Sequence, residues 1–359
     1  MSTVPKCRFV LVVFVILFIL GGCTVATVQV APAQQMSTRV AKTVAPIPVK
    51  VLIITSFSPE ADAWLKQLAF DQAIPVPGLS ADYPNVHCTA TDICLVTTGM
   101  GHTNAAVSMT ALVLNGKFDF SHTYFIVTGI AGIDPNLGTI GTAAWARYLV
   151  DFGLAHEIDA REMPSAWQTG YFGIDANNPD TKPDLRYKTE VFRLDEALLQ
   201  RAVAFSRQVT LEDTDAAKAY RKFYKETAAR AAPSVLQCDT SSGDTYWHGR
   251  ELGLRSTRWT ALLTDGKGTY CTTQQEDNAT YEALKRGAAA GLLDISRIAV
   301  LRTAANFDRP HPGQTAYESL NSKSGGFGAA IANLYHAAWP LVNDIVTRWQ
   351  LWRDAVPAQ

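Results

Sequence analysis

Continuous runs of apolar residues mark the strands that this chain is expected to form. Residues 49–55 read V-K-V-L-I-I-T, residues 93–96 read I-C-L-V, and residues 125–127 read F-I-V. Runs of this kind are typical of strands that are buried on both faces of a parallel sheet. A further run at residues 298–303, I-A-V-L-R-T, is the last strand that the pattern predicts.

Helical periodicity, with apolar or small residues three and four positions apart, lies between these strands. The segment that follows residues 93–96 predicts a helix over residues 102–114, so that strand, helix and next strand form a right-handed βαβ crossover. Residues 156–190 are rich in Asp, Asn, Pro and Tyr and are expected to wrap the surface. The other predicted helices are 60–68, 195–208, 215–232, a segment ending at 290, and 329–353; further strands are predicted at 138–146 and 148–152.

Two of the predicted strands end in glycine-containing segments, T-T-G-M-G and T-G-I-A-G. Glycine lets a ligand approach the backbone because no Cβ stands in the way. Ligands of open α/β sheets bind just outside the carboxyl ends of the strands. We therefore expect both segments to be loops that face one cleft; the alternative for the second segment is a tight turn before a hairpin. The candidate residues are Gly99, Met100, Thr128, Gly129 and Ala131.

Polar side chains follow the first and the last of the predicted strands. Ser56 comes directly after the first strand, and Glu60 falls in the first turn of the helix that Pro59 begins. An acidic residue there could equally complement the helix dipole. Asn306 and Asp308 follow the last strand in the same way.

Two later stretches combine polar and aromatic residues. S-S-G-D-T-Y-W-H-G includes aromatic side chains beside a glycine, which can stack on a flat heterocycle or simply be half-buried. Q-Q-E-D-N-A-T opens a helix, and its polar side chains could cap that helix or hold sugar hydroxyls. The candidates from these two stretches are Asp244, Tyr246, Trp247, Glu276, Asp277 and Asn278.

The composition suits one large α/β domain or two small ones, since 47% of the 359 residues are hydrophobic and 18% are charged. A net charge of −1 without a basic run argues against nucleic acid as a partner. No Cys/His spacing resembles a zinc site, so no metal or other cofactor is expected.

The N-terminus has the pattern of an export signal. Lys6 and Arg8 precede about twelve apolar residues, which are too few for a membrane span of about 20, and a small-residue site follows. Leu20-Gly21-Gly22-Cys23 resembles a bacterial lipobox, in which Cys23 is lipidated; a plain secretory signal or an uncleaved anchor are the alternatives. The expected organisation is a signal at 1–23, a flexible tether at 24–48 and one domain at 49–359, exported to the periplasm or tethered to the outer membrane.

Four cysteines remain in the domain, and an even number fits an oxidising compartment. Cys88 and Cys94 flank a short turn, which makes a local disulfide plausible, and Cys238 with Cys271 could form a second one. Four buried free thiols are the alternative.

Taken in order, these motifs resemble the nucleoside phosphorylase/nucleosidase superfamily and, more closely, the family named purine nucleoside permease. T-Q-Q-E-D-N-A-T and R-T-A-A-N-F-D-R-P are the most specific parts, and the resemblance covers roughly residues 49–350. It implies an α/β fold, a three-layer sandwich with a mixed, partly barrel-like central sheet, in which a purine nucleoside lies across the strand ends. Superfamily members are often dimers or trimers, so the resemblance is compatible with a homo-oligomer.

The resemblance also implies roles for single residues. Thr128, Gly129 and Ala131 would line base and sugar, Tyr246 would stack on the purine with Trp247 beside it, Asn278 and Glu276 would hold the ribose, and Asn306 would contact the purine N7. Hydrolytic relatives have Asp where this chain has Asn306, so Asp308 is a candidate substitute acid. Glu60 aligns with the carboxylate that orients water, and phosphate-binding arginines have no obvious counterpart. The leading expectation is therefore cleavage of the N-glycosidic bond by water, and the alternative is a non-catalytic nucleoside-binding or uptake component.

Overall fold

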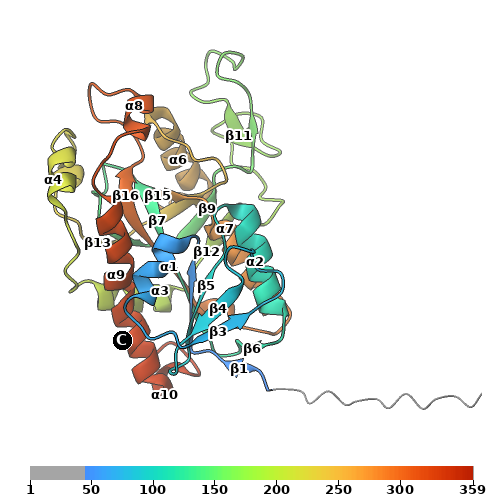
Figure 1. Cartoon of the computed structure of the whole chain (residues 1–359). Helices are drawn as coiled ribbons and strands as arrows, with labels where there is room; N and C mark the ends of the chain where they lie inside the picture. The colour runs from blue at the N-terminus through green and yellow to red at the C-terminus, as the bar shows by residue number, and fades with distance from the viewer. Residues whose placement is uncertain (1–44, 359) are drawn as a thin grey trace, which may run out of the picture. The chain divides into compact units, whose positions relative to one another are not determined.

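The computed structural model describes residues 45–358, and these form one compact unit around a twelve-stranded mixed sheet (Figure 1). The signal segment, Cys23 and most of the tether lie outside the described residues. The last two residues of the predicted tether form a short strand, β1 (Ile47–Pro48). This strand pairs in parallel with β6 (Phe118–Asp119). The ordered domain thus begins slightly before residue 49.

The centre of the sheet consists of strands that the apolar runs predicted. β2 (Val51–Thr55) lies between β5 (Ile93–Thr97) and β7 (Tyr124–Ile133), and all three are parallel. β7 also pairs in parallel with β16 (Ile298–Phe307) and, at its end, antiparallel with β15 (Tyr270–Gln274). The sheet is therefore mixed, as expected. It branches at β7, because this strand pairs with β2, β15 and β16.

The remaining strands extend this sheet or form small ribbons. They are β3 (Gln72–Pro75), β4 (Asn85–Cys88), β8 (Ala143–Trp145), β9 (Tyr148–Asp151), β10 (Ala155–Glu157), β11 (Tyr171–Gly173), β12 (Val191–Arg193), β13 (Val235–Gln237) and β14 (Asp239–Ser242). The longest path through the sheet has the order β12-β9-β14-β15-β7-β2-β5-β4-β3.

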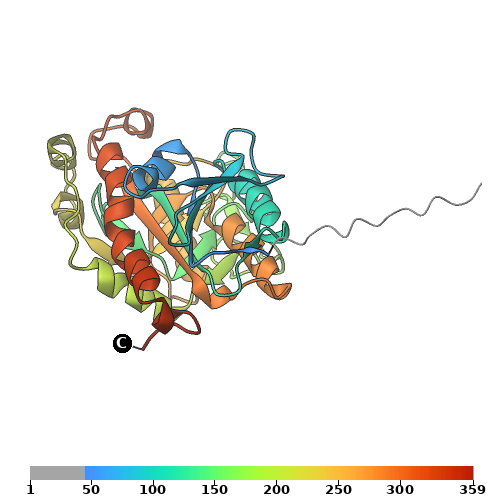
Figure 2. The ribbon, with the colours of Figure 1, turned by 60° about the horizontal axis from the view of Figure 1, so that its bottom comes forward.

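Helices cover both faces of the sheet, which gives the expected three layers (Figure 2). α2 (His102–Leu114) and α7 (Asp277–Ala289) pack on one face. The other face carries α1 (Ser58–Leu65), α3 (Glu196–Ser206) and α9 (Phe327–Thr347). The other helices are α4 (Asp215–Arg221), α5 (Thr227–Arg230), α6 (Arg250–Leu263), α8 (Ala316–Leu320) and α10 (Trp349–Trp352).

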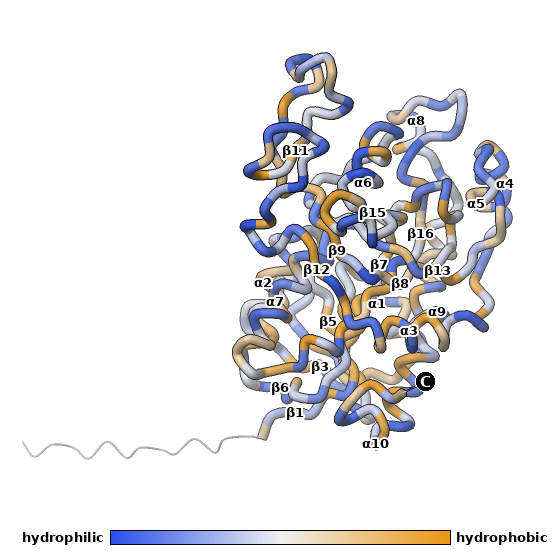
Figure 3. The backbone as a smooth tube through the Cα atoms, turned by 180° about the vertical axis from the view of Figure 1, so that it is seen from behind, coloured by the Kyte–Doolittle hydropathy of each residue, from blue (hydrophilic) through white to orange (hydrophobic). Residues whose placement is uncertain are grey.

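The side chains of β2 show why this strand is apolar up to its final residue, Thr55. Leu52 and Ile54 belong to the core on the α2 side, whereas Val51 and Ile53 belong to the core on the α9 side. Because successive side chains of a strand point to opposite faces, a strand covered on both faces needs apolar residues at every position. Figure 3 shows the hydrophobic segments gathered in these central strands.

The glycine segment after residue 127 is not the loop that the sequence predicted. Gly129 and Gly132 lie inside β7, because β16 pairs with β7 over the whole length from Phe125 to Ile133 and keeps the backbone extended. A loop was expected because small residues usually end strands. The first glycine segment does follow its strand, and both Gly99 and Gly101 have positive φ angles, 87° and 88°.

Other predicted boundaries differ in detail. The helix expected at 215–232 is two short helices, α4 and α5, and most of the strand expected at 138–146 is irregular. α6, β14 and β15 were not predicted. The surface segment at 156–190 does extend outward and carries the β10–β11 ribbon (Figure 1). None of the helices within residues 45–358 is both long enough and apolar enough to cross a membrane.

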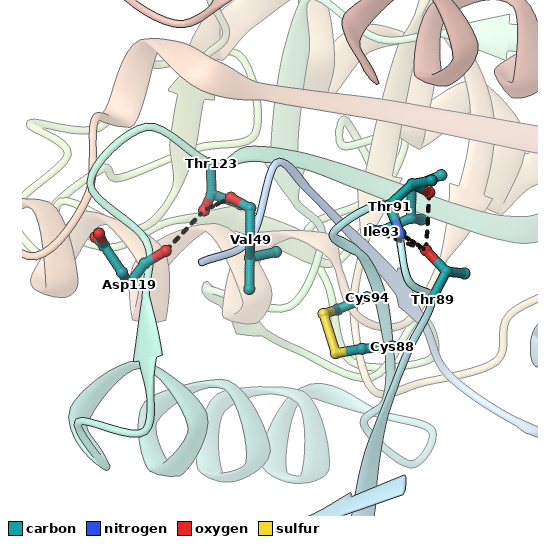
Figure 4. The surroundings of a disulfide bond; sticks show 8 residues. All are labelled: Val49, Cys88, Thr89, Thr91, Ile93, Cys94, Asp119 and Thr123. Atoms are coloured by element: carbon teal, nitrogen blue, oxygen red, sulfur yellow. Dashed lines mark hydrogen bonds between the residues drawn. A yellow bond between two sulfur atoms is a disulfide. The ribbon is translucent and has the colours of Figure 1, made fainter. Parts of the chain in front are cut away.

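Disulfides join Cys88 to Cys94 and Cys238 to Cys271. Cys88 ends β4 and Cys94 belongs to the neighbouring antiparallel strand β5, so the first bond links directly opposed positions (Figure 4). Both sulfurs are buried in the core on the α2 side.

Replacing Cys88 and Cys94 together by alanine is expected to lower the free energy of unfolding by about 2 kcal/mol, because a short closed loop restricts the unfolded chain only modestly. The urea midpoint of the double variant measures this. Wild type in reductant should lose at least as much stability as the variant, because reductant also breaks the Cys238–Cys271 bond. A midpoint of the variant equal to that of oxidised wild type would contradict the expectation.

Candidate functional site

A cavity of about 190 Å³ lies at the carboxyl ends of the central strands. It is lined by the β2–α1 connection and the first turn of α1, by the loop after β5, by β7, by the loop after β14, by the β15–α7 junction and by β16. The chain thus brings together segments that are far apart in sequence. The lining residues are Ser56, Phe57, Glu60, Met100, Ile130, Ala131, Gly132, Thr245, Tyr246, Trp247, Thr273, Gln274, Gln275, Glu276, Arg302 and Asn306.

Glu60 is a buried carboxylate that is held in one position. One of its oxygens accepts hydrogen bonds from the backbone N–H of Ser56 at 2.7 Å and from the Ser56 hydroxyl at 2.8 Å. The other accepts from the backbone N–H of Ile130 at 2.7 Å. Burial raises the pKa of Glu60 to about 7, although Arg302 and these donors act in the opposite direction. A carboxyl group with such a pKa can gain or lose a proton near neutrality.

Arg302 is the centre of a buried ion cluster. Its guanidinium donates from Nε to Asp277 Oδ2 at 3.1 Å and from Nη2 to the other Asp277 oxygen, and Nη2 also donates to Glu276 Oε2 at 3.3 Å. Nη1 donates to the carbonyl oxygen of Ile130 at 3.2 Å. Burial acts to lower the pKa of Arg302, but Asp277 and Glu276 raise it above its usual range. The guanidinium is therefore a fixed charge beside Glu60.

Carboxylates also cap the start of α2, which begins two residues after the lining residue Met100; of the two carboxylates, Glu276 lines the cavity and Asp244 does not. Glu276 Oε1 accepts a hydrogen bond from the backbone N–H of Gly101 at 3.2 Å, and Asp244 Oδ1 accepts from the backbone N–H of His102 at 2.7 Å. The first N–H groups of a helix normally attract an anion. Here two carboxylates of the chain itself occupy that place.

An amide and an exposed aromatic ring form another part of the wall. Asn306 donates from Nδ2 to the carbonyl oxygen of Phe307 at 2.8 Å, and its Oδ1 lies 3.5 Å from the hydroxyl of Tyr246. Tyr246 is 60% exposed and is thus free to contact a ligand. Trp247, in contrast, is buried and stacks on Phe152 with 5.1 Å between the ring centroids.

Eight of the residues predicted from sequence line this one cavity. They come from six separate segments of the chain and include the carboxylates Glu60 and Glu276, which were expected near a water and near a sugar. The eight are Ser56, Glu60, Met100, Ala131, Tyr246, Trp247, Glu276 and Asn306.

Thr128, Gly129, Gly99 and Asp277 do not line the cavity. Gly129 and Asp277 contact Arg302, which does line it, whereas Thr128 and Gly99 contact residues outside its wall. The hydroxyl of Thr128 accepts a hydrogen bond from Trp64 Nε1 at 3.1 Å. A Cβ on Gly129 would lie 2.3 Å from Arg302 Nη1, so glycine is required there for the guanidinium to pass. Gly99 adopts its positive φ against the Asn104 side chain. Asp277 is fully engaged with Arg302.

Asp308, the candidate substitute acid, does not reach the cavity. Its carboxylate accepts hydrogen bonds from Arg309 Nε at 2.7 Å and from the Tyr270 hydroxyl at 2.6 Å. Burial raises its pKa to about 6, whereas its bond to Arg309 acts to lower it. Because these partners hold the group away from the lining residues, the expectation that it protonates a ligand is wrong in this structure.

Asn278 also lies elsewhere. It lines a second hollow between α2 and α7 with His102, Asp151 and Glu282, and its Nδ2 donates to the carbonyl oxygen of Thr189 at 2.8 Å. Asn278 is therefore not positioned to hold a ribose in the strand-end cavity. The helical turn at the start of α7 separates its side chain from that of Glu276.

Sequence reasoning missed Arg302, Phe57, Thr245 and the two glutamines. Arg302 had a signal, because a charged residue inside the apolar run I-A-V-L-R-T must find a partner when it is buried. The glutamines belong to the stretch Q-Q-E-D-N-A-T, which the sequence did mark as polar. Phe57 had no such signal, since it becomes part of the wall only through the fold. Within residues 45–358, no group of three or more His, Cys, Asp and Glu side chains is arranged to hold a metal ion.

Comparison with known proteins gives two kinds of similarity. Residues 48–357 match the family described as purine nucleoside permease (NUP). A purine nucleoside permease of Candida albicans is 43% identical over 306 residues, which cover 84% of this chain and 75% of the relative. A probable purine nucleoside permease of Schizosaccharomyces pombe is 42% identical, with 84% of this chain and 90% of the relative covered.

Among solved structures, similar folds occur at low identity. A 5′-methylthioadenosine/S-adenosylhomocysteine nucleosidase of Neisseria meningitidis is 16% identical with a TM-score of 0.49, covering 82% of this chain and 99% of that one. Futalosine hydrolase of Helicobacter pylori is 14% identical with a TM-score of 0.48, covering 83% and 97%.

Proposed function

The chain belongs to the purine nucleoside permease family, and from this premise we propose that it binds a purine nucleoside in the strand-end cavity as a component of nucleoside uptake. One observation carries the proposal: a fixed guanidinium, two buried carboxylates, an amide and an exposed tyrosine ring converge on one small cavity. Pockets for small ligands combine an apolar wall with a few such fixed polar groups.

The chemistry of the wall matches the two halves of a nucleoside. The ring of Tyr246 offers a face on which a purine can stack, and the amide of Asn306 can hydrogen-bond a ring nitrogen. Glu276 and Glu60 are acceptors that suit the hydroxyl donors of a ribose. The cavity volume of about 190 Å³ favours a compact ligand, because pockets that hold drug-sized ligands have volumes of roughly 300–1,000 Å³.

Cleavage of the N-glycosidic bond is the second candidate function, and the state of Glu60 favours it. A carboxyl group whose pKa is raised to about 7 and that lies beside a fixed cation is suited to accept a proton from water. The leaving purine would then be stabilised by hydrogen bonds from Asn306, since an amide cannot serve as the acid.

Calorimetry and product analysis separate the two functions. Inosine, guanosine and adenosine are titrated into the purified protein, and each mixture is then analysed for free base with and without phosphate. Binding without release of base supports the uptake component, whereas release of base without phosphate supports hydrolysis. Absence of binding and of release with all three nucleosides would overturn both candidates.

Asp244 is expected to make the site selective for uncharged ligands. Its carboxylate occupies the start of α2, where a phosphate would otherwise be attracted, and Glu276 adds a second negative charge. Inosine 5′-monophosphate should therefore bind at least tenfold more weakly than inosine. Asp244→Asn should narrow this difference by about two- to fivefold, because a charge at a helix N-terminus contributes roughly 0.3–1 kcal/mol.

A matched control is Asp265→Asn, which removes the same charge from an exposed turn where Asp265 pairs with Lys182. It should leave the preference for inosine unchanged. The preference of wild type should also weaken at high salt, because the charge at α2 is exposed. Equal affinities of wild type for inosine and its monophosphate would contradict this explanation.

A further inference from the structure

A third hollow, of about 420 Å³, lies between the segment that carries β11 and helix α6. It shares no lining residue with the strand-end cavity. Figures 1 and 3 both place the β11 segment beyond the sheet on the side where α6 lies. Its lining residues are Ala166, Trp167, Gln168, Thr169, Tyr171, Asn178, Pro179, Asp180, Arg255, Arg258 and Trp259.

Arg255 is the unusual feature of this hollow, because it is a buried cation without a counter-ion. The side chain is 5% exposed, and within residues 45–358 it forms no ion pair. Nη2 donates to the carbonyl oxygen of Phe152 at 2.6 Å, but Nε and Nη1 have no acceptor among the described residues. Buried charges in proteins are normally paired.

Aromatic rings hold the guanidinium in place. It lies 3.6 Å from the centroid of the Phe152 ring and 3.9 Å from that of the Tyr171 ring, so it is stacked between them. Burial lowers the pKa of Arg255 to about 10, and Tyr171, Glu157 and Asp151 offset this only in part. The rings therefore fix the position of the charge without neutralising it.

Arg258 adds a second positive charge to the same wall. It lies one helical turn after Arg255 on α6, lines the hollow, and forms no ion pair within the described part of the chain. Asp180 is the one carboxylate in the lining, so the two arginines exceed it by one charge. Trp167 and Trp259 provide flat apolar surface next to these charges.

We propose that this hollow is a binding site for a small aromatic anion, with the guanidinium groups of Arg255 and Arg258 facing its carboxylate or phosphate and Trp167 and Trp259 contacting its ring. Arginine is suited to this role because its planar donors match both oxyanions. A bound oxyanion would supply the negative charge that Arg255 lacks, which accounts for a buried cation that would otherwise destabilise the fold.

Titration calorimetry with simple probes tests the site in the full chain. Benzoate and phenyl phosphate represent the two kinds of oxyanion, benzyl alcohol lacks the charge, and inorganic phosphate lacks the ring. Both aromatic anions, or one of them, should bind at least tenfold more tightly than benzyl alcohol and inorganic phosphate. The relative affinities of benzoate and phenyl phosphate show which oxyanion the arginines prefer.

Variants locate the binding. Arg258→Ala should weaken binding of the preferred probe by about ten- to hundredfold, because hydrogen bonds to charged groups are among the stronger ones. Arg250→Ala, at the first position of the same helix and away from the hollow, should leave it unchanged. Arg255→Met should abolish binding while its melting temperature stays close to that of wild type, since the substitution removes an unpaired buried charge. Inosine binding should be unaffected in all three variants.

Two results would overturn the proposal. The first is that neither aromatic anion binds wild type more tightly than benzyl alcohol. The second is that the preferred probe binds Arg258→Ala and Arg255→Met as tightly as wild type. A large fall in the melting temperature of Arg255→Met, together with the first result, would show that Arg255 serves only to join α6 to the β11 segment.

Discussion

Arg302→Met is expected to lower the free energy of unfolding at pH 7 by about 3–5 kcal/mol, because it leaves buried carboxylates without their cation. Asp277 and Glu276 both rely on this guanidinium, and Asp277 is completely buried. The same substitution removes the donor to Ile130 and the fixed charge beside Glu60, so inosine binding should also be lost. Urea unfolding monitored by circular dichroism measures the first effect, and calorimetry measures the second.

The pH dependence of this loss follows from the sign of the pKa changes. Burial already raises the pKa of Asp277, and removal of Arg302 would raise it further. A carboxyl group whose folded pKa exceeds its unfolded pKa stabilises the fold at low pH, and that contribution is lost as pH rises through the folded pKa. The loss of unfolding free energy caused by Arg302→Met should therefore be smaller at pH 5 than at pH 7.

Two further variants control for the loss of packing. Arg302→Lys keeps the charge but not the planar fork, and should fall between wild type and Arg302→Met. Combining Arg302→Met with Asp277→Asn should recover part of the stability, because the double variant buries no unpaired Asp277 charge. If the double variant were no more stable than Arg302→Met at pH 7, uncompensated charge at Asp277 would not be the cause.

The central strands could be predicted from sequence because their signal is local. Each of β2 and β5 is covered on both faces and is apolar up to its final threonine, so an apolar run marks the place of each strand to within two residues. Helix α2 was predicted with its observed bounds for a similar reason, since its buried positions recur with helical spacing. The sequence was thus sufficient for the elements that carry most of the core.

The path of the backbone at Gly129 could not be predicted, because its cause lies in a distant segment. Pairing with β16 keeps β7 extended, and the guanidinium of Arg302, a residue of β16, fills the space above the glycine. A glycine that makes room for a side chain and a glycine that ends a strand look the same in sequence. Only the register between β7 and β16 distinguishes them.

The positions of the Asn306 and Asp308 side chains also depend on a feature that could not be predicted from the sequence. The register of β16 against β7 shifts between Ala304 and Asn306, as in a β-bulge. A bulge adds a residue to one strand and changes which side chains face a given side. Asn306 follows this shift and lines the cavity. Asp308 comes after the end of β16 at Phe307, so it no longer follows the alternation of the strand, and it bonds to Arg309 and Tyr270. Strand alternation alone would have given both residues the same face.

Glu60→Gln provides the sharpest separation of hydrolysis from binding alone. If Glu60 accepts a proton from water, this isosteric change should lower the rate of base release by about 10²–10⁴-fold. Inosine affinity should change far less, because an amide still fills the space and its oxygen can still accept a hydrogen bond. Base release and calorimetry on the same samples give both quantities.

The pH profile of base release supplies the mechanistic part of this prediction. Burial raises the pKa of Glu60 to about 7, so below that pH the group is protonated and cannot act as a base. The rate of base release by wild type should therefore rise with pH through about 7 and level off above it. The rate of Glu60→Gln should show no such rise. Asp62→Asn changes an exposed acid of the same helix that pairs with Lys66, and it should keep both the rate and its rise with pH. A wild-type protein that binds inosine yet releases no base at any pH would exclude hydrolysis and leave Glu60 as an acceptor for the ligand, because the same contacts that orient a water can hold a sugar hydroxyl.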